Sequence, residues 1–444
     1  MKEVPPEFPS WHGPRSASAV VRSLNKRTAP AVRMSSRGFW IVVAVLIGVL
    51  AAAAPNLIRR IRLHRQEATT IGPAVGMPGA PPTSPSGLQE RIEDMERRLR
   101  EQPGDVNAAV LLADALLRQA RATTDGRPAN RAAEVLKTVL TEDPVQYDAL
   151  RMLGAIDLSQ HHFRDALNVA NRARDLRPED AWNYGVMGDA LIELGDYEKA
   201  FEAFDTMMTL RPSAAAYARV SYARELRGDL QGALQAMDLA AKATPPQDPE
   251  AQAWYATHIG ELYLKLGMFD EANRAYRQAI FVFANYPLAV IGQGKVKVAR
   301  GDRDGALALY LDQMKRTPTL DLASRIGDLY LEAGNAAESE HYYQLAEDLA
   351  GPPVAQTEAN LALFLANHNR KLAEAVKVAE AVAGIRRDIF TEDALAWAYF
   401  KVGRIDEAKA ASARALRTGT RDEQLLSRAA QIQAASRPHA RSGT

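Results

Sequence analysis

Four prolines recur at an almost constant spacing, and this period limits the fold more than any other feature of the chain. Pro144, Pro178 and Pro212 lie 34 residues apart, and Pro245 follows 33 residues later. The segments between them are rich in Ala and carry apolar residues at helical spacing. A period of about 34 residues is the length of a helix–turn–helix unit. Because Pro ends helices, residues from 88 onward are predicted to form a solenoid of stacked helix pairs.

Small residues occupy fixed positions within this period. Gly recurs at position 8 of the unit, Ala at position 20 and an aromatic residue at position 24, as in Gly188, Ala200 and Phe204. A large side chain at position 8 or 20 would wedge the two helices apart where they cross. A further Gly follows the first helix of six units, where a left-handed cap is expected. These six residues are Gly195, Gly228, Gly267, Gly301, Gly334 and Gly403.

This pattern resembles that of the tetratricopeptide repeat (TPR) family. The turn between paired helices is repeated in LGDYEKAFEAF, LGMFDEANRAY and VGRIDEAKAAS. Weaker units complete the array, including residues 106–146, which carry the insertion ATTDGRPAN. The resemblance implies an all-α TPR solenoid, coiled as a right-handed superhelix, with about nine repeats and terminal capping helices over residues 88–436. It also implies a concave groove, lined by the first helix of each repeat, that binds partner proteins.

The groove-facing positions of the family identify candidate binding residues here. They include aromatic side chains next to carboxylates, a combination that suits a partner segment with apolar anchors and some positive charge. The alternative is a solvated helix face whose Trp residues pack between repeats. The predicted residues are Trp182, Asp189, Glu193, Tyr222, Trp254, Glu261, Asp328, Glu332 and Trp397.

An apolar stretch near the N-terminus predicts a membrane span. Residues 39–58 read FWIVVAVLIGVLAAAAPNLI, and twenty helical residues cross a hydrocarbon core of about 30 Å. The basic residues that follow, from Arg59 to Arg65, are placed to reach lipid phosphates. A cleaved signal peptide is the alternative reading, with Ala51–Ala54 as the cleavage region. Ala44, Gly48 and Ala52 form a small-residue stripe that would let two spans pair as a homodimer, although such residues are common in any span.

The orientation of the span is left open by its flanking charges. Five Lys/Arg precede it within twenty residues and four follow it, so the positive-inside rule gives almost a tie. Long domains translocate largely regardless of charge, which favours a periplasmic body. A translation start at Met34 would reverse this preference and place the body in the cytoplasm.

Charge divides the chain into a basic end and an acidic body. The whole chain has 55 Lys+Arg and 54 Asp+Glu, but residues 1–65 carry a net charge of +9 and residues 66–444 a net charge of −8. An acidic body gives no reason to expect nucleic acid as a partner. Residues 1–38 and 437–444 are predicted to be disordered, and residues 59–87 to form a basic and then Pro/Gly-rich linker.

Catalytic and cofactor motifs are missing from the sequence. The chain has no Cys, which excludes disulfides, thiol nucleophiles and Cys-ligated metals. We found no HExxH zinc motif, complete phosphate loop, GxSxG elbow or dinucleotide fingerprint, so we expect no enzyme activity, metal or cofactor. The competing hypothesis is an enzyme with an unfamiliar site in the insertion at 121–130 or in the turn at 161–165, which contains His161, His162 and Asp165.

The sequence therefore favours a membrane-anchored TPR scaffold that binds proteins through its groove. A span followed by a linker and a TPR array is similar to the layout of assembly factors in cytochrome c maturation, which implies complex assembly at a bacterial-type envelope. A cytoplasm-facing regulatory adaptor is the alternative. Partner, pathway and oligomeric state are not encoded in any motif that we recognise.

Overall fold

A computed structural model describes residues 85–123, 127–245, 248–350 and 355–435 of the chain. The predicted segments 1–38 and 437–444, the span at 39–58 and almost all of the linker at 59–87 lie outside these ranges. Within the described ranges no helix has both the length and the apolar character needed to cross a bilayer.

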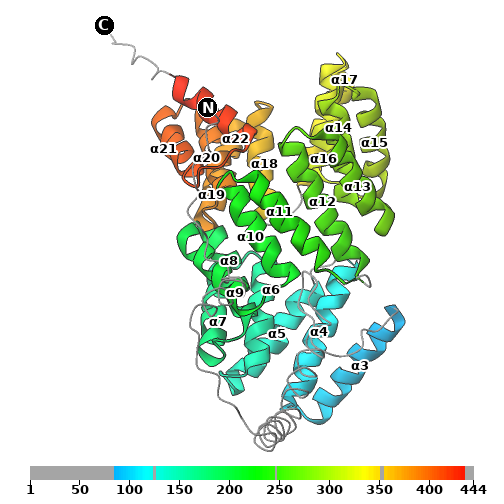
Figure 1. The fold of residues 1–444 in the computed structure, drawn as a ribbon, viewed down its shortest axis with the longest axis vertical. Helices are drawn as coiled ribbons and strands as arrows, with labels where there is room; N and C mark the ends of the chain where they lie inside the picture. Colours follow the sequence, from blue (N-terminus) through cyan, green and yellow to red (C-terminus); the bar gives the residue numbers. More distant parts are fainter. Residues whose placement is uncertain (1–84, 124–126, 246–247, 351–354, 436–444) are drawn as a thin grey trace, which may run out of the picture. The chain divides into compact units, whose positions relative to one another are not determined.

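Twenty helices and no strand make up the described residues (Figure 1). The N-terminal half contains α3 (Pro85–Glu101), α4 (Val106–Thr123), α5 (Arg127–Glu142), α6 (Tyr147–Ser159), α7 (Phe163–Leu176), α8 (Ala181–Leu194), α9 (Tyr197–Leu210), α10 (Ala214–Leu226), α11 (Leu230–Lys242) and α12 (Pro249–Lys265). The C-terminal half contains α13 (Phe269–Val282), α14 (Pro287–Ala299), α15 (Arg303–Arg316), α16 (Leu320–Glu332), α17 (Ala336–Leu349), α18 (Ala355–Asn367), α19 (Leu372–Ile385), α20 (Ile389–Lys401), α21 (Ile405–Ala415) and α22 (Glu423–Ala434).

The helices pack in consecutive pairs, beginning with α4 and α5 and ending with α20 and α21. Each helix contacts its partner along its length, and each pair stacks on the next pair in the sequence. The helices α3 and α22 pack on the first and last pairs. The all-α solenoid predicted from the sequence is thereby confirmed for the described residues. The predicted insertion at 121–130 lengthens α4 to Thr123, and α5 begins at Arg127.

In four helix pairs, a contact between a Gly at position 8 and an aromatic ring at position 24 sets the spacing of the two helices. A Cβ added to Gly188 would lie 2.2 Å from the ring of Phe204, and one added to Gly294 would lie 2.1 Å from the ring of Tyr310. Each aromatic ring therefore occupies the space that a side chain at position 8 would need. In these and in other pairs, the Ala residues at position 20 are completely buried. They are Ala132, Ala166, Ala200, Ala233, Ala272, Ala306, Ala375 and Ala408.

In the pair α10/α11, a hydrogen bond links positions 8 and 20. Ser221 stands at position 8 of the pair α10/α11 and is fully buried. Its hydroxyl donates to the carbonyl oxygen of Ala233, at position 20 of the same pair, over 2.8 Å. The polar atom is thus satisfied inside the core, so Ser serves where most repeats have Gly.

The turns inside the pairs require a left-handed residue. Six of them use the predicted Gly, with φ between +72° and +81°. In two further turns among the described residues, His161 (φ +61°) and Asn369 (φ +53°) take this conformation. Asn adopts it at modest cost because its side chain hydrogen-bonds locally.

Gly294→Ala tests the contact between positions 8 and 24. The added methyl would overlap the ring of Tyr310, which is only 1% exposed. We expect the free energy of unfolding to fall by roughly 2–3 kcal/mol, a typical cost of overpacking. Urea denaturation of the full chain measures this change.

Gly384→Ala is the matched control, because Gly384 lies in α19 with nothing within 4 Å of an added Cβ. In that open position, Ala should stabilise the helix by up to about 1 kcal/mol. Equal destabilisation by both substitutions would contradict the proposed role of position 8.

Candidate functional site

A hollow on one side of the solenoid is the strongest candidate for a functional site. It has a volume of about 820 Å³ and is bounded by α12, α14 and α16, with the segment before α22 closing one side. Its apolar lining includes Leu264, Phe269, Val298 and Leu329. Its polar lining consists of Glu261, Lys265, Lys295, Tyr310, Arg325, Asp328, Glu332, Arg421, Asp422, Glu423 and Gln424.

The repeat period places three charged residues that line the hollow in a row. Glu261, Lys295 and Asp328 occupy position 9 of three consecutive repeats, so stacking brings them to one face. The ammonium group of Lys295 lies 2.9 and 3.0 Å from the two carboxylate oxygens of Glu261. An ion pair between neighbouring repeats therefore runs across the floor of the hollow.

Lys265 of α12 forms ion pairs with two other parts of the chain. Its ammonium group lies 2.8 Å from the carboxylate of Glu225 on α10 and 3.3 Å from that of Asp422, the N-cap of α22. Burial lowers the pKa of Lys265, but the two carboxylates outweigh this effect and leave that pKa above its usual value. Lys265 is therefore a charged bridge from α10 to Asp422, which lies 157 positions after Lys265 in the sequence.

The third repeat of the hollow carries a hydrogen-bond chain. One carboxylate oxygen of Asp328 accepts from the hydroxyl of Tyr343 over 2.8 Å and lies 2.7 Å from Nε2 of His368. Arg325 donates to Asp321 over 2.9 Å. Glu332 is exposed and pairs with Arg303 of α15. Three predicted binding residues, Glu261, Asp328 and Glu332, are thus brought together in one hollow.

The other predicted residues lie elsewhere in the solenoid. Trp182 is half-buried under the guanidinium of Arg151, which lies 5.1 Å from its ring centroid. Asp189 accepts two hydrogen bonds, of 2.9 and 2.6 Å, from Arg219 in the next repeat. Trp254 stacks on His258, with ring centroids 3.9 Å apart.

Glu193 and Tyr222 lie at a contact between distant repeats. The carboxylate of Glu193 is 2.7 Å from the guanidinium of Arg386. Burial raises the pKa of Glu193 to about 7, although Arg386 acts in the opposite direction. Burial likewise raises the pKa of Tyr222, and the nearby carboxylate of Glu193 adds to the increase. These two side chains face C-terminal helices of the same solenoid.

Trp397 differs from the expectation of an exposed aromatic anchor. It is only 6% exposed and belongs to the apolar core of the C-terminal repeats. Its indole stacks on Phe400 at 5.0 Å between ring centroids. The helix α20 is packed by α18, α21 and α22 together, which covers a position that faces solvent in an isolated repeat.

Some lining residues were missed by the sequence interpretation. Lys295 could have been found, because it lies 34 residues after Glu261 at the same repeat position. The residues from Arg421 to Gln424 could not, since they belong to no repeat and reach the hollow only through long-range folding.

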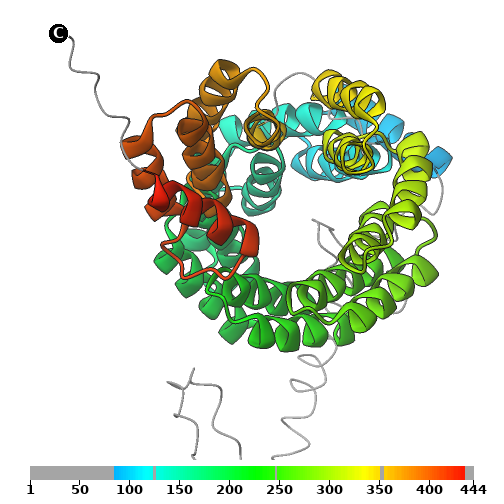
Figure 2. The ribbon, with the colours of Figure 1, turned by 90° about the horizontal axis from the view of Figure 1, so that it is seen from above.

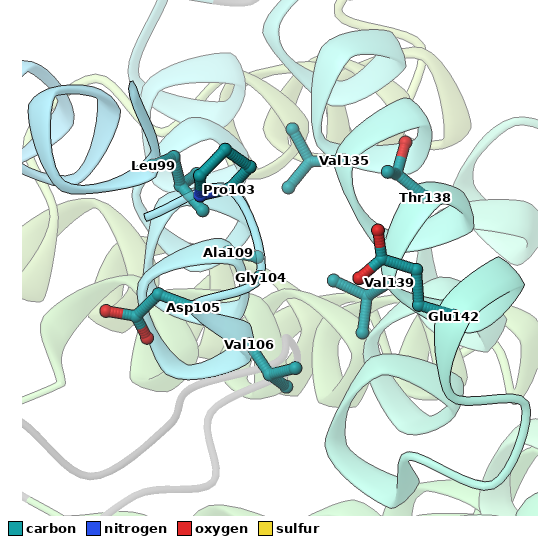
Figure 3. Close-up of a pocket in the computed structure, with 10 residues that line it drawn as sticks. All are labelled: Leu99, Pro103, Gly104, Asp105, Val106, Ala109, Val135, Thr138, Val139 and Glu142. Atoms are coloured by element: carbon teal, nitrogen blue, oxygen red, sulfur yellow. The ribbon is translucent and has the colours of Figure 1, made fainter. Parts of the chain in front are cut away.

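A smaller apolar pocket lies between α3, α4 and α5 (Figure 3). It has a volume of about 190 Å³, and Leu99, Pro103, Val135 and Val139 provide much of its lining. Figure 3 shows the carboxylate of Asp105 turned away from the two valines. A hydrogen bond from the Ala108 amide, together with Arg98, keeps the pKa of Asp105 below its usual range.

The turn at 161–165 shows perturbed ionisation without a metal-type cluster. Within the described residues no three His, Asp or Glu side chains are grouped to hold a metal. Asp157 is buried beneath this turn, and its burial, helped by the charge of Asp165, raises its pKa to about 6. Burial and the charge of Arg386 lower the pKa of His161. His162 and Asp165 are exposed, but the predicted turn is shorter than expected, because His162 is the N-cap of α7 and Asp165 lies in its first helical turn.

The family comparison matches the centre of the solenoid. A family model described as Tetratricopeptide repeat matches residues 152–214, 186–249 and 259–321. These ranges include α8 to α11, α13 to α15 and the C-terminal part of α12, and so α14 and part of α12 among the helices that line the hollow. The chain therefore carries TPR repeats.

Individual relatives share this repeat region at low identity. Protein KINESIN LIGHT CHAIN-RELATED 3 of Arabidopsis thaliana is 23% identical over 213 residues, which cover 45% of this chain and 28% of that protein. Protein O-mannosyl-transferase TMTC1 of Mus musculus is 28% identical over 119 residues, covering 26% of this chain and 13% of that protein. The chain thus spans less than a third of the length of these relatives.

Among solved structures, the human IFIT1 dimer with m7Gppp-AAAA is similar in fold. The match has a TM-score of 0.50 and 14% identity, and it covers 75% of this chain and 78% of that chain. At this identity the likeness is one of fold alone.

Replacing the buried carboxylate beside the 161–165 turn should change how stability depends on pH. Because the pKa of Asp157 is raised in the folded state, its contribution is present below about pH 4 and is lost as pH rises through about 6. We expect Asp157→Asn to raise the free energy of unfolding by roughly 1–2 kcal/mol at pH 7.5, with little effect at pH 4.

Urea denaturation at the two pH values measures this difference. Asp175→Asn, at an exposed position on α7, is the control and should change stability little at either pH. An Asp157→Asn effect that is the same at both pH values would contradict the assignment.

Proposed function

We propose that this protein is a non-catalytic scaffold that binds an extended segment of a partner protein in the hollow between α12, α14 and α16. The observation that carries the proposal is the lining itself. Apolar side chains such as Leu264 and Val298 lie beside a row of charged side chains from three repeats. Apolar anchors give affinity, and the charges fix the register and select the partner.

Pairing of the charges inside the hollow shapes what a partner can do. Glu261 forms an ion pair with Lys295, and Glu332 forms one with Arg303. The bound segment therefore meets side chains whose orientation is already fixed. Pre-orientation lowers the entropy cost of binding. A segment with both positive and negative side chains can extend these pairs without leaving a charge unpaired.

Membrane tethering through residues 39–58 is the second part of the proposal. The motivation is the apolar run and its basic flank in the sequence. A tethered body would collect its partner at the membrane surface, in assembly of an envelope complex. The stripe of Ala44, Gly48 and Ala52 would allow two tethered copies to pair.

Photo-crosslinking tests the binding surface. A photoreactive amino acid is placed at Glu332, which is exposed in the hollow, or at Gln278, which is exposed on α13 outside it. In cells of the native host, we expect a discrete protein adduct from position 332 and none from 278. Adducts of equal yield from both positions would contradict the assignment.

Exchanging two charges in the row of position-9 residues tests whether this row contacts the partner. Lys295→Glu combined with Glu261→Lys keeps an ion pair but reverses its direction. We expect it to lower the adduct yield from position 332 at least about fivefold, corresponding to ~1 kcal/mol, while thermal unfolding changes little. An unchanged yield would mean that the row does not contact the partner.

Protease accessibility tests the proposed location. With a periplasmic body, protease added to intact spheroplasts should degrade the solenoid. A cytoplasmic body, as in a regulatory adaptor, would be degraded only after lysis. Release of the body into the soluble periplasmic fraction would show that residues 39–58 are cleaved and do not anchor it.

A further inference from the structure

The C-terminal helices of the solenoid return to its third and fourth repeats. The amide N–H of Arg387 donates to the carbonyl oxygen of Glu193 over 2.7 Å, and the amide of Ile389 donates to the hydroxyl of Tyr197 over 2.8 Å. These residues are more than 190 positions apart in the sequence. Figures 1 and 2 both show the orange and red C-terminal helices beside the green helices of these repeats.

Charged side chains reinforce the contact at the loop before α20. Arg386 lies 2.7 Å from the carboxylate of Glu193 and 2.7 Å from that of Asp388. The side chains of Arg386 and Asp388 are 13% and 3% exposed. Opening the contact would separate Arg386 from Glu193, and the return of these charges to water would offset part of the pairing energy that is lost.

A second contact lies at the loop before α22. Lys265 bridges Glu225 of α10 to Asp422 of that loop, as described above. Apolar side chains close the space between the two contacts. Ile389 and Leu425 are buried in one cluster with Leu191, Tyr197 and Leu226.

The glycine caps show which turns are covered. All six have nearly the same φ, but a Cβ on Gly267, Gly301, Gly334 or Gly403 would meet nothing within 4 Å. A Cβ on Gly195 would lie 2.6 Å from the carbonyl oxygen of Arg387, and one on Gly228 would lie 2.8 Å from that of Gly419. At these two positions the backbone of another part of the chain fills the space of a side chain.

We propose that these contacts form a reversible clasp that holds the segment Arg421–Gln424 as a wall of the hollow and, on opening, admits the partner. Solenoid repeats contact mainly their neighbours, so the clasp can open by small rotations between repeats without unfolding any pair. The contact is mostly polar and has a small apolar cluster, which keeps the cost of opening well below that of unfolding. The role of the clasp in admitting a partner rests on the proposed function, whereas the existence of the clasp does not.

Two alanine substitutions should open the clasp, and two others control for backbone strain. Gly195→Ala and Gly228→Ala place a methyl against the carbonyl oxygens of Arg387 and Gly419. Gly301→Ala and Gly334→Ala impose the same left-handed strain, with φ of +81° and +78°, in open space. Thermal unfolding of all four variants establishes that the repeats are folded.

Spin-label distances report the state of the clasp directly. The chain has no Cys, so Glu202→Cys on α9 and Ser427→Cys on α22, both exposed, give one labelled pair. We expect a single short distance in the unsubstituted chain and in the Gly301→Ala and Gly334→Ala variants, and a longer, broader population in the Gly195→Ala and Gly228→Ala variants. The same distance in all four variants, or the same shift in all four, overturns the clasp.

Adduct yield from position 332 then tests gating separately. A clasp that admits the partner predicts at least a twofold higher yield in the Gly195→Ala variant than in the Gly301→Ala variant. A longer label distance with an unchanged yield overturns the gating role. Absence of any adduct from position 332, with the label distances as expected, counts against the binding site and leaves the clasp supported.

Discussion

Close packing between a Gly and an aromatic ring determines the rest of this structure. Where the ring of Tyr310 lies against Gly294, the two helices of a pair approach closely and their crossing is fixed. This contact recurs in four pairs, at Gly188, Gly260, Gly294 and Gly327, and the other pairs keep a small Gly, Ala or Ser at the same crossing, so successive pairs stack alike. The row of position-9 side chains that lines the hollow is a direct consequence of this repetition.

Ion pairs between neighbouring repeats add a second layer of order. Glu261 with Lys295 and Asp189 with Arg219 connect equivalent faces of consecutive repeats. Partly exposed pairs of this kind contribute little stability individually. Their larger effect is on geometry, since they hold side chains of both signs in fixed orientations on adjacent repeats.

The repeats could be predicted from the sequence, but the contact of the C-terminal helices with the third and fourth repeats could not. Local rules identify the helix pairs, because the Gly caps, the buried Ala residues and the prolines each act within one period. The same rules predicted Trp397 as exposed, since they consider one repeat and omit α18 and α22, which also pack on α20. The contacts of Arg387 and Asp422 with Glu193 and Lys265 depend on small rotations summed over many repeats, and no local pattern records that sum.

Amide hydrogen exchange of the full chain tests the closure of the array most directly. Ile389 is the first residue of α20, a position whose N–H has no partner within its own helix. Since this N–H donates to Tyr197, it should exchange much more slowly than the N–H of Leu320, the first residue of α16. Exchange of Ile389 as fast as that of Leu320 would contradict the closure and, with it, the wall of the hollow.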